Sequence, residues 1–174
     1  MSLRIAALGL LAQHPGSGYD LLKRFEKSMA NVWPATQSQL YGELNKLAAA
    51  GLIEVTDVGP RNRKEYRVTE AGRAELIRWV TTPQDDPPTR SAELLRVFLL
   101  GELPAEQARA HLTAVAEHFE SEVRRLEELR ASIPWSCRDE DFYGAAALEY
   151  GLRSNTMGAE WARWVIKGID ERTT

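Results

Sequence analysis

The stretch that decides the fold is residues 36–69, TQSQLYGELNKLAAAGLIEVTDVGPRNRKEYRVT. Its first part places leucines at 40, 44 and 47, a spacing that forms one buried stripe on a helix. Gly51 then stands where helices commonly end with a glycine in the left-handed conformation. Beyond it, apolar and polar residues alternate on both sides of Gly59-Pro60, as in two paired strands. The stretch therefore predicts a helix followed by a β-hairpin.

Three further helical patterns surround this stretch. Residues 5–11 carry one apolar stripe, which ends at the break at 15–16. Ser17 and Asp20 have the spacing of a capping box, so a second helix is expected to begin there. After the hairpin, Thr69 is placed to cap another helix. The order helix, helix, helix, hairpin, helix within about 80 residues is that of a winged helix-turn-helix, whose third helix enters a DNA groove.

The second half of the chain is expected to be entirely helical. Residues 83–90 contain three prolines, which favour extended backbone, so they predict a connector between a domain at 1–82 and a domain at 91–174. Pro104 suits the start of a long helix and Pro134 ends it, with a last helix at about 139–170. The predicted fold class is mainly α: a winged helix-turn-helix domain followed by an all-helical dimerisation domain with a long coiled-coil-like helix.

Two interleaved series of residues, each with a spacing of seven, run along the long helix. Together they form the a/d seam of a coiled coil, which only Glu122 interrupts. An isolated helix would leave this seam uncovered, so we expect it to pack on a partner chain or on a neighbouring helix. On the first of these interpretations, the dimer interface is formed by Leu112, Val115, Phe119, Leu126, Leu129 and Ile133.

The third helix of the winged domain presents a polar face opposite its leucines. At 100° per residue, Ser38, Gly42 and Asn45 fall at the centre of that face. The face is nearly free of acid, although an ordinary solvated face would also be polar. Amide side chains can read an adenine edge, and Gly42 permits a close approach to DNA. The candidate DNA-binding residues on this helix are Ser38, Gln39, Tyr41, Gly42, Asn45 and Lys46.

The tip of the hairpin is strongly basic. Arg61, Arg63 and Lys64 lie within four residues and repel one another unless a polyanion is near. They suit contacts with phosphates or insertion into the minor groove. A loop that merely increases solubility is the alternative interpretation.

Composition and charge narrow the class of protein. The net charge of −3 divides into +3 over residues 1–82 and −6 over 83–174, so only the first half is expected to meet a polyanion, unless the division is a chance fluctuation. The longest apolar run, residues 5–12, is far shorter than the roughly 20 residues of a membrane span. Cys137 is the single cysteine, which excludes an intrachain disulfide and a cysteine-based zinc site. A cytoplasmic protein without a membrane partner is expected.

Candidate sites for chemistry are few. His111 and His118 share a helix face at a spacing of seven, but metal-binding pairs on helices more often lie four apart, so no metal site is expected. The sequence has no phosphate-binding loop, dinucleotide fingerprint or catalytic-triad order, so neither an enzyme nor a cofactor is expected. A candidate ligand pocket in the helical domain consists of Trp135, Met157, Trp161 and Trp164, although aromatic residues at helical spacing more often form core or interface.

Five motifs in the first half resemble the PadR family of bacterial transcriptional regulators over residues 3–82. They are LGLL (8–11), GYDL (18–21), QLYGEL (39–44), AGLI (50–53) and YRVTEAG (66–72). The remaining residues resemble the helical C-terminal domain of the longer PadR-like proteins and of virulence-gene activators. The resemblance implies that the polar recognition-helix residues are Gln37, Ser38, Gln39 and Tyr41, and that the basic wing is Arg61, Arg63 and Lys64.

The resemblance also implies a mode of action. Members of the family are homodimers that are held together by their C-terminal helices, bind inverted-repeat operators and usually repress, and some release DNA on binding phenolic acids. We therefore expect a sequence-specific repressor with double-stranded DNA, a second copy and a small aromatic effector as partners. Two alternatives stay open: a winged-helix module that binds another protein, and a small-molecule sensor without a primary role on DNA.

Overall fold

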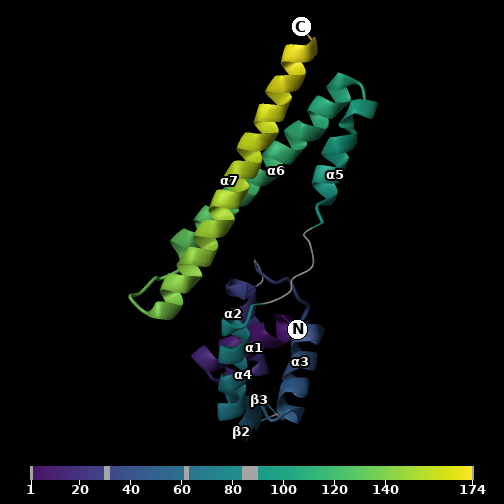
Figure 1. Cartoon of the computed structure of the whole chain (residues 1–174). Helices are drawn as coiled ribbons and strands as arrows, with labels where there is room; N and C mark the ends of the chain where they lie inside the picture. The colour runs from purple at the N-terminus through teal and green to yellow at the C-terminus, as the bar shows by residue number, and fades with distance from the viewer. Residues whose placement is uncertain (1, 30–31, 61–62, 84–89, 174) are drawn as a thin grey trace. The chain divides into compact units, whose positions relative to one another are not determined.

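The structure of the protein is a computed structural model, which describes residues 2–29, 32–60, 63–83 and 90–173. The chain forms two compact units, Met1–Asp86 and Pro87–Thr174 (Figure 1). The predicted connector at 83–90 lies almost wholly outside the described residues, as does Arg61 at the tip of the hairpin.

The first unit has the order of elements that the sequence predicts. The helices are α1 (Ser2–Gln13), α2 (Gly18–Lys27), α3 (Gln37–Ala49) and α4 (Glu70–Thr81), and the hairpin consists of β2 (Ile53–Gly59) and β3 (Arg63–Val68). A two-residue strand, β1 (Gly16–Ser17), was not predicted; it pairs with β3 to give an antiparallel sheet of order β1-β3-β2. The winged helix-turn-helix prediction is confirmed.

Local sequence signals fix the ends of these helices. Ser17 and Asp20 form the predicted capping box of α2, and Thr36 caps α3. Gly51 has a φ of 66°, the left-handed conformation expected after α3. These caps supply partners for backbone groups that the helix itself leaves unpaired.

The core of the first unit joins α1, α2, α3 and the sheet. The predicted stripe of α3 (Leu40, Leu44, Leu47) is fully buried against residues of the other elements. Those partners include Leu8, Leu11, Leu21, Phe25, Ile53, Tyr66 and Val68. Burial of one face of α3 in this core fixes which of its residues face outward.

The second unit consists of α5 (Ala92–Leu99), a 3₁₀ turn η3 (Leu100–Glu102), α6 (Ala105–Ser132) and α7 (Asp139–Thr173). Pro104 is the residue that precedes α6 rather than its first member. The long helices α6 and α7 lie side by side as an antiparallel pair (Figure 1). Within the part of the chain that is described, no helix is long and apolar enough to cross a membrane.

The seam of α6 packs within the chain. Leu112 and Leu126 are 0% and 4% exposed in the single chain. A Cβ added at Gly158 or Gly151 of α7 would lie 2.8 Å from the Phe119 ring or 3.2 Å from Leu126 Cδ1, so these small residues let the helices approach closely. Within the single chain, α7 thus contacts Phe119 and Leu126, in agreement with packing on a neighbouring helix, while the dimer-interface role of Leu112, Phe119 and Leu126 stays a prediction. Val115, Leu129 and Ile133 are half-buried.

Candidate nucleic-acid interface

The outward face of α3 is polar and sterically open. Ser38 and Asn45 are exposed on the side opposite the buried leucines, and Gln37 is exposed in the first turn. A Cβ added at Gly42 would have no described atom within 4 Å, so the space above it is empty of protein. The face therefore combines hydrogen-bonding side chains with a point at which another molecule can approach the helix backbone.

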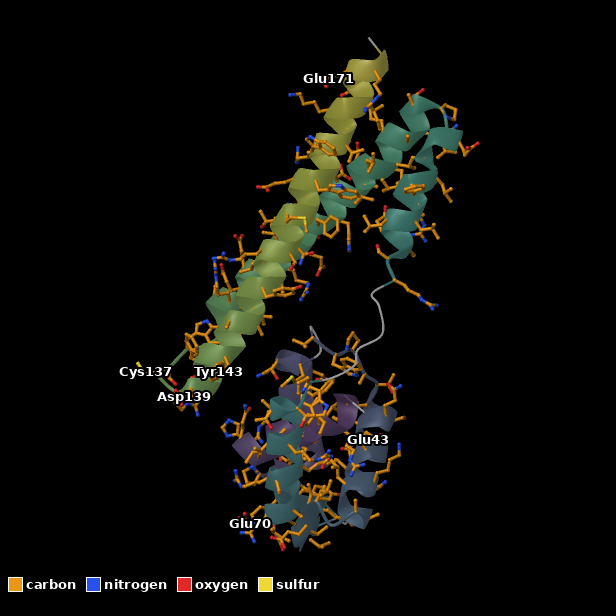
Figure 2. All side chains as sticks on the ribbon, in the orientation of Figure 1. Glu43, Glu70, Cys137, Asp139, Tyr143 and Glu171 are labelled. Carbon is orange, nitrogen blue, oxygen red and sulfur yellow. The ribbon has the colours of Figure 1, made fainter. Side chains whose placement is uncertain are left out.

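Two of the candidate residues on α3 already have partners. The side-chain oxygen of Gln39 accepts hydrogen bonds from the backbone N–H of Thr36 at 2.8 Å and from its hydroxyl at 3.2 Å. Lys46 donates to Glu43 at 2.7 Å, in an ion pair on the surface of α3, where Figure 2 labels Glu43. Reading an adenine edge needs both the oxygen and the amide nitrogen of a glutamine. Gln39 would have to leave its cap to make that contact.

Tyr41 lies on the side of α3 that packs on α2. A Cβ added at Gly18 would lie only 2.6 Å from the Tyr41 ring, so the glycine is needed for this packing. Burial, with Tyr41 as a neighbour, raises the pKa of Tyr66 above its ordinary value. The ring of Tyr41 thus contributes to the core of the winged unit, although the sequence makes Tyr41 a candidate for contact with DNA.

The described cations of the wing differ in their surroundings. Lys64 is exposed, on the strand pair opposite Val58. Arg63 lies between two carboxylates: its Nη2 is 2.8 Å from Asp20 Oδ2, and its Nε is 3.2 Å from Glu65 Oε1. This pairing could not be predicted from residue spacing, because Asp20 is 43 positions away along the chain.

Asp20 joins the wing to the start of α2. Its Oδ2 accepts from the hydroxyl of Ser17 at 2.6 Å, from the Ser17 backbone N–H at 3.1 Å and from Arg63. Hydrogen bonding by Ser17, together with the charge of Arg63, lowers the pKa of Asp20 below its ordinary value. Both interactions favour the ionised carboxylate.

The four residues of the candidate ligand pocket are not gathered in the chain by itself. Trp135 lies in the α6–α7 connection and packs near Gly144 of α7. Trp161 is 17 positions beyond Gly144 on the same helix, a separation of about 25 Å at 1.5 Å per residue. Met157 and Trp164 are exposed. A surface cavity of about 300 Å³ between α6 and α7 includes Met157 and mainly charged residues, but its lining contains none of these three tryptophans.

The two histidines of α6 do not form a metal site in the described residues. His111 Nε2 lies 2.8 Å from Glu93 Oε1 of α5, and this pair links the two helices. No group of three or more metal-ligating side chains occurs in the described ranges.

Two exposed apolar surfaces of the second unit were not predicted from the sequence, although two of their residues, Met157 and Trp164, were candidates for the ligand pocket. None of the residues of α5 is buried, and Phe98 is 89% exposed. On α7, four large side chains recur every seven residues and are all exposed: Tyr143, Tyr150, Met157 and Trp164. We call these four the α7 stripe; Figure 2 labels its first member, Tyr143, near the start of the helix. The spacing of seven was visible in the sequence and is the signal by which it could have been found.

Comparison with known families identifies both units. Residues 7–78 match the transcriptional regulator PadR-like family, and residues 89–170 match the family of the virulence activator alpha C-terminal domain. The chain thus contains a PadR-like family domain followed by a virulence-activator C-terminal domain. This PadR-like chain is therefore a DNA-binding transcriptional regulator, as its winged-helix fold indicates.

A relative from Bacillus subtilis is similar over nearly the whole length. The negative transcriptional regulator PadR of that organism is 29% identical over 97% of this chain and 98% of its own. The crystal structure of Bacillus subtilis PadR with operator DNA superposes with a TM-score of 0.84 at 26% identity, covering 97% of this chain and 99% of that one. Its crystal structure with p-coumaric acid gives a TM-score of 0.85 at 28% identity, with coverages of 98% and 99%.

Proposed function

We propose that this PadR-like regulator binds an inverted-repeat operator as a homodimer and represses transcription there. The open polar face of α3 is the observation that carries the proposal. A helix in the major groove needs polar side chains beside a surface that admits DNA, and the face around Gly42 has both. The structure of Bacillus subtilis PadR with operator DNA supports the same use of the fold.

The candidate residues then divide by the partner that each has in the free protein. The exposed residues Gln37, Ser38 and Asn45 are proposed to reach base edges. The exposed Lys64 is proposed to contact a phosphate, which carries no base identity, and Lys46 would do so only on leaving its ion pair with Glu43. Arg61, Gln39 and Tyr41 remain candidates from the sequence. Arg61 lies outside the described residues, Gln39 caps α3, and Tyr41 packs on Gly18.

Gly42→Ala tests the proposal at its central point. In the free protein the added methyl group meets no described atom, and alanine stabilises a helix relative to glycine by about 1 kcal/mol. Against DNA the same methyl group would press on the groove. We expect operator affinity to fall by an amount similar to the loss of one base contact, roughly 1–3 kcal/mol. Mobility shifts on genomic fragments selected by the wild-type protein measure this loss.

Gly101→Ala is the matched control, because an added Cβ there also meets no described atom. It lies in η3 of the second unit and should leave operator affinity unchanged. Wild-type affinity in Gly42→Ala, with the variant folded, would show that the α3 face does not lie against DNA.

The exposed apolar residues of the second unit support assembly into a homodimer. An eight-residue helix such as α5 is marginal on its own in water, yet Leu94, Leu95, Phe98 and Leu99 are all exposed in the single chain. A large exposed apolar patch marks an interaction site. A second copy of the chain supplies the cover that this helix lacks.

The α7 stripe extends the proposed interface. Tyr150 and Trp164 are 76% and 72% exposed, on a different face of α7 from Gly151 and Gly158, which pack on α6. α7 thus has one apolar face used within the chain and a second at heptad spacing, the pattern by which helices pair. Because a homodimer is two-fold symmetric, its two winged units match an operator with two inverted half-sites.

Repression and an aromatic effector are supported by the Bacillus subtilis relative. That protein is named a negative regulator, and its structure was solved with p-coumaric acid. We propose that this chain responds to a similar aromatic acid. Titration with p-coumaric acid should change tryptophan fluorescence and lower operator affinity at the same concentrations, by a factor in the usual range of about 5–150.

The two effects must be linked, because a ligand shifts an equilibrium only through its different affinities for the two states. Benzoic acid serves as the control compound, because it lacks the phenolic hydroxyl of p-coumaric acid and the vinyl group between the ring and the carboxylate. A fluorescence change without any change in operator affinity would show that p-coumaric acid binds adventitiously, and it would contradict the effector proposal.

A further inference from the structure

A continuous set of contacts connects the recognition helix to the wing. Tyr41 of α3 packs on Gly18 of α2, where an added Cβ would lie 2.6 Å from the ring. Asp20 lies two positions further along α2, and its Oδ2 accepts from Arg63 Nη2 at 2.8 Å. Arg63 is the first residue of β3, opposite Gly59 at the end of the hairpin next to its tip. The wing is thereby tied to the helix that supports α3.

The capping box of α2 makes Asp20 a rigid anchor. The carboxylate is held by the hydroxyl and the backbone N–H of Ser17, and Ser17 is 1% exposed. Ser17 also belongs to β1, where it pairs with Glu65 of β3. The sheet is therefore attached to the start of α2 twice: by strand pairing at Ser17, and nearer the tip by the pair of Asp20 with Arg63.

The charge of Arg63 is largely cancelled where it lies. Its Nη2 faces Asp20 and its Nε faces Glu65 at 3.2 Å, so one cation stands between two carboxylates. A cation that is already paired in this way adds little to the release of counterions from DNA, which depends on phosphates that are newly neutralised. Lys64, the next residue, is exposed and serves as its comparison.

We propose that Asp20 and Arg63 are positioning residues for DNA binding: their ion pair holds the tip-side end of β3 against α2 and so sets the placement of the wing relative to α3. The inference rests on the proposed function, because it gives the wing a role in contacting DNA. Arg63 acts through the wing that it holds, and the direct phosphate contact falls to Lys64.

Matched substitutions of the two neighbouring cations separate these roles. In salt titrations on the selected operator, Lys64→Gln should lower the slope of log affinity against log salt by about 0.9, the value for one phosphate. Arg63→Gln should leave that slope unchanged and weaken the affinity by about two- to fivefold, the range for an exposed ion pair. A fall in slope of about one unit in Arg63→Gln would overturn the proposal, because it would show that Arg63 binds a phosphate.

Asp20→Asn and the double variant test the pair itself. The asparagine oxygen can still accept from Ser17, so the variant removes the charge that faces Arg63 and keeps a cap. Asp20→Asn should weaken operator binding as much as Arg63→Gln does, and the double variant should be no weaker than either. Arg63→Lys keeps the charge but cannot reach both carboxylates with a planar fork, so it should restore little. Tighter binding by Asp20→Asn, or full rescue by lysine, would contradict a positioning role.

Hydrogen exchange in the free protein gives a result that does not depend on DNA. In Arg63→Gln, the amides of the hairpin near the Gly59–Arg63 pair should exchange faster, while those near the Ile53–Val68 pair stay as in the wild type. Arg63→Gln leaves the capping box intact, so it carries this test even where Asp20→Asn does not fold. Unchanged exchange near Gly59 would refute the attachment. Absence of binding to any duplex by the wild type would instead refute the proposed function alone.

Discussion

At the scale of single residues, Gly72 shows how closely the winged unit is packed. It lies in the first turn of α4, where Thr69 caps its backbone N–H at 3.1 Å. A Cβ added at Gly72 would lie 2.1 Å from the carbonyl oxygen of Leu52 and 2.8 Å from a methyl group of Val68. Because the first of these neighbours is backbone, it cannot turn away as a flexible side chain does.

Gly72→Ala is therefore expected to destabilise the protein by about 1–3 kcal/mol, the cost of overpacking a core. Urea unfolding of the full chain, followed by circular dichroism, measures the change. Gly42→Ala, where the same methyl group meets open space, should unfold at the same urea concentration as the wild type or a higher one. Equal stability of Gly72→Ala and the wild type would show that the contact between α4 and Leu52 is looser than described.

The same scale shows what residue types alone can predict about the DNA surface. The spacing of Leu40, Leu44 and Leu47 correctly predicts the buried side of α3, because burial follows from helical period. The helical period does not show whether a polar side chain already has a hydrogen-bond or ion-pair partner within the protein. Gln39 is occupied by a local cap, which the spacing from Thr36 could have indicated. Arg63 is occupied by a carboxylate from a distant helix, which only the folded chain reveals.

At the scale of elements, the helices were more predictable than their partners. Two interleaved series of residues, each with a spacing of seven, predict the α6 seam, and two of its members, Leu112 and Leu126, are buried. A seam specifies that an apolar surface must be covered, but it does not say by which helix. Here α7 covers it, because a short connection brings the next helix back along α6, and Gly151 and Gly158 allow close packing.

The smallest element was not predicted for a related reason. β1 comprises only Gly16–Ser17, too short for an alternating pattern to be recognised. Its pairing with β3 depends on where the hairpin lies in the folded unit. The capping signal at Ser17 was nevertheless correct, because a cap depends on residues three positions apart.

At the scale of the whole molecule, the distribution of charge and of apolar surface suggests a division of labour. The first half of the sequence is basic on balance and carries the polar α3 face, while the second half is acidic and carries the exposed residues of α5 and the α7 stripe. An acidic surface repels DNA, so the second unit suits contacts with another copy of the chain. We therefore propose that the first unit binds DNA and that the second unit dimerises.

Substitutions on the two long helices test this assignment, because Tyr150 of α7 faces outward and Leu126 of α6 is buried within the chain. Tyr150→Glu places a charge in the exposed α7 stripe, so it should leave each chain folded but make the protein monomeric in sedimentation experiments at micromolar concentration. Operator affinity should then fall by about 10²–10⁴, because two linked half-sites are no longer bound together. Thr156→Glu, exposed on another side of α7, should remain dimeric. Leu126→Ala should lose about 2–5 kcal/mol of unfolding free energy, because its side chain is buried against α7 of the same chain, and still assemble. A monomeric wild type, or a Tyr150→Glu variant that assembles normally, would place the contact between copies elsewhere or remove it.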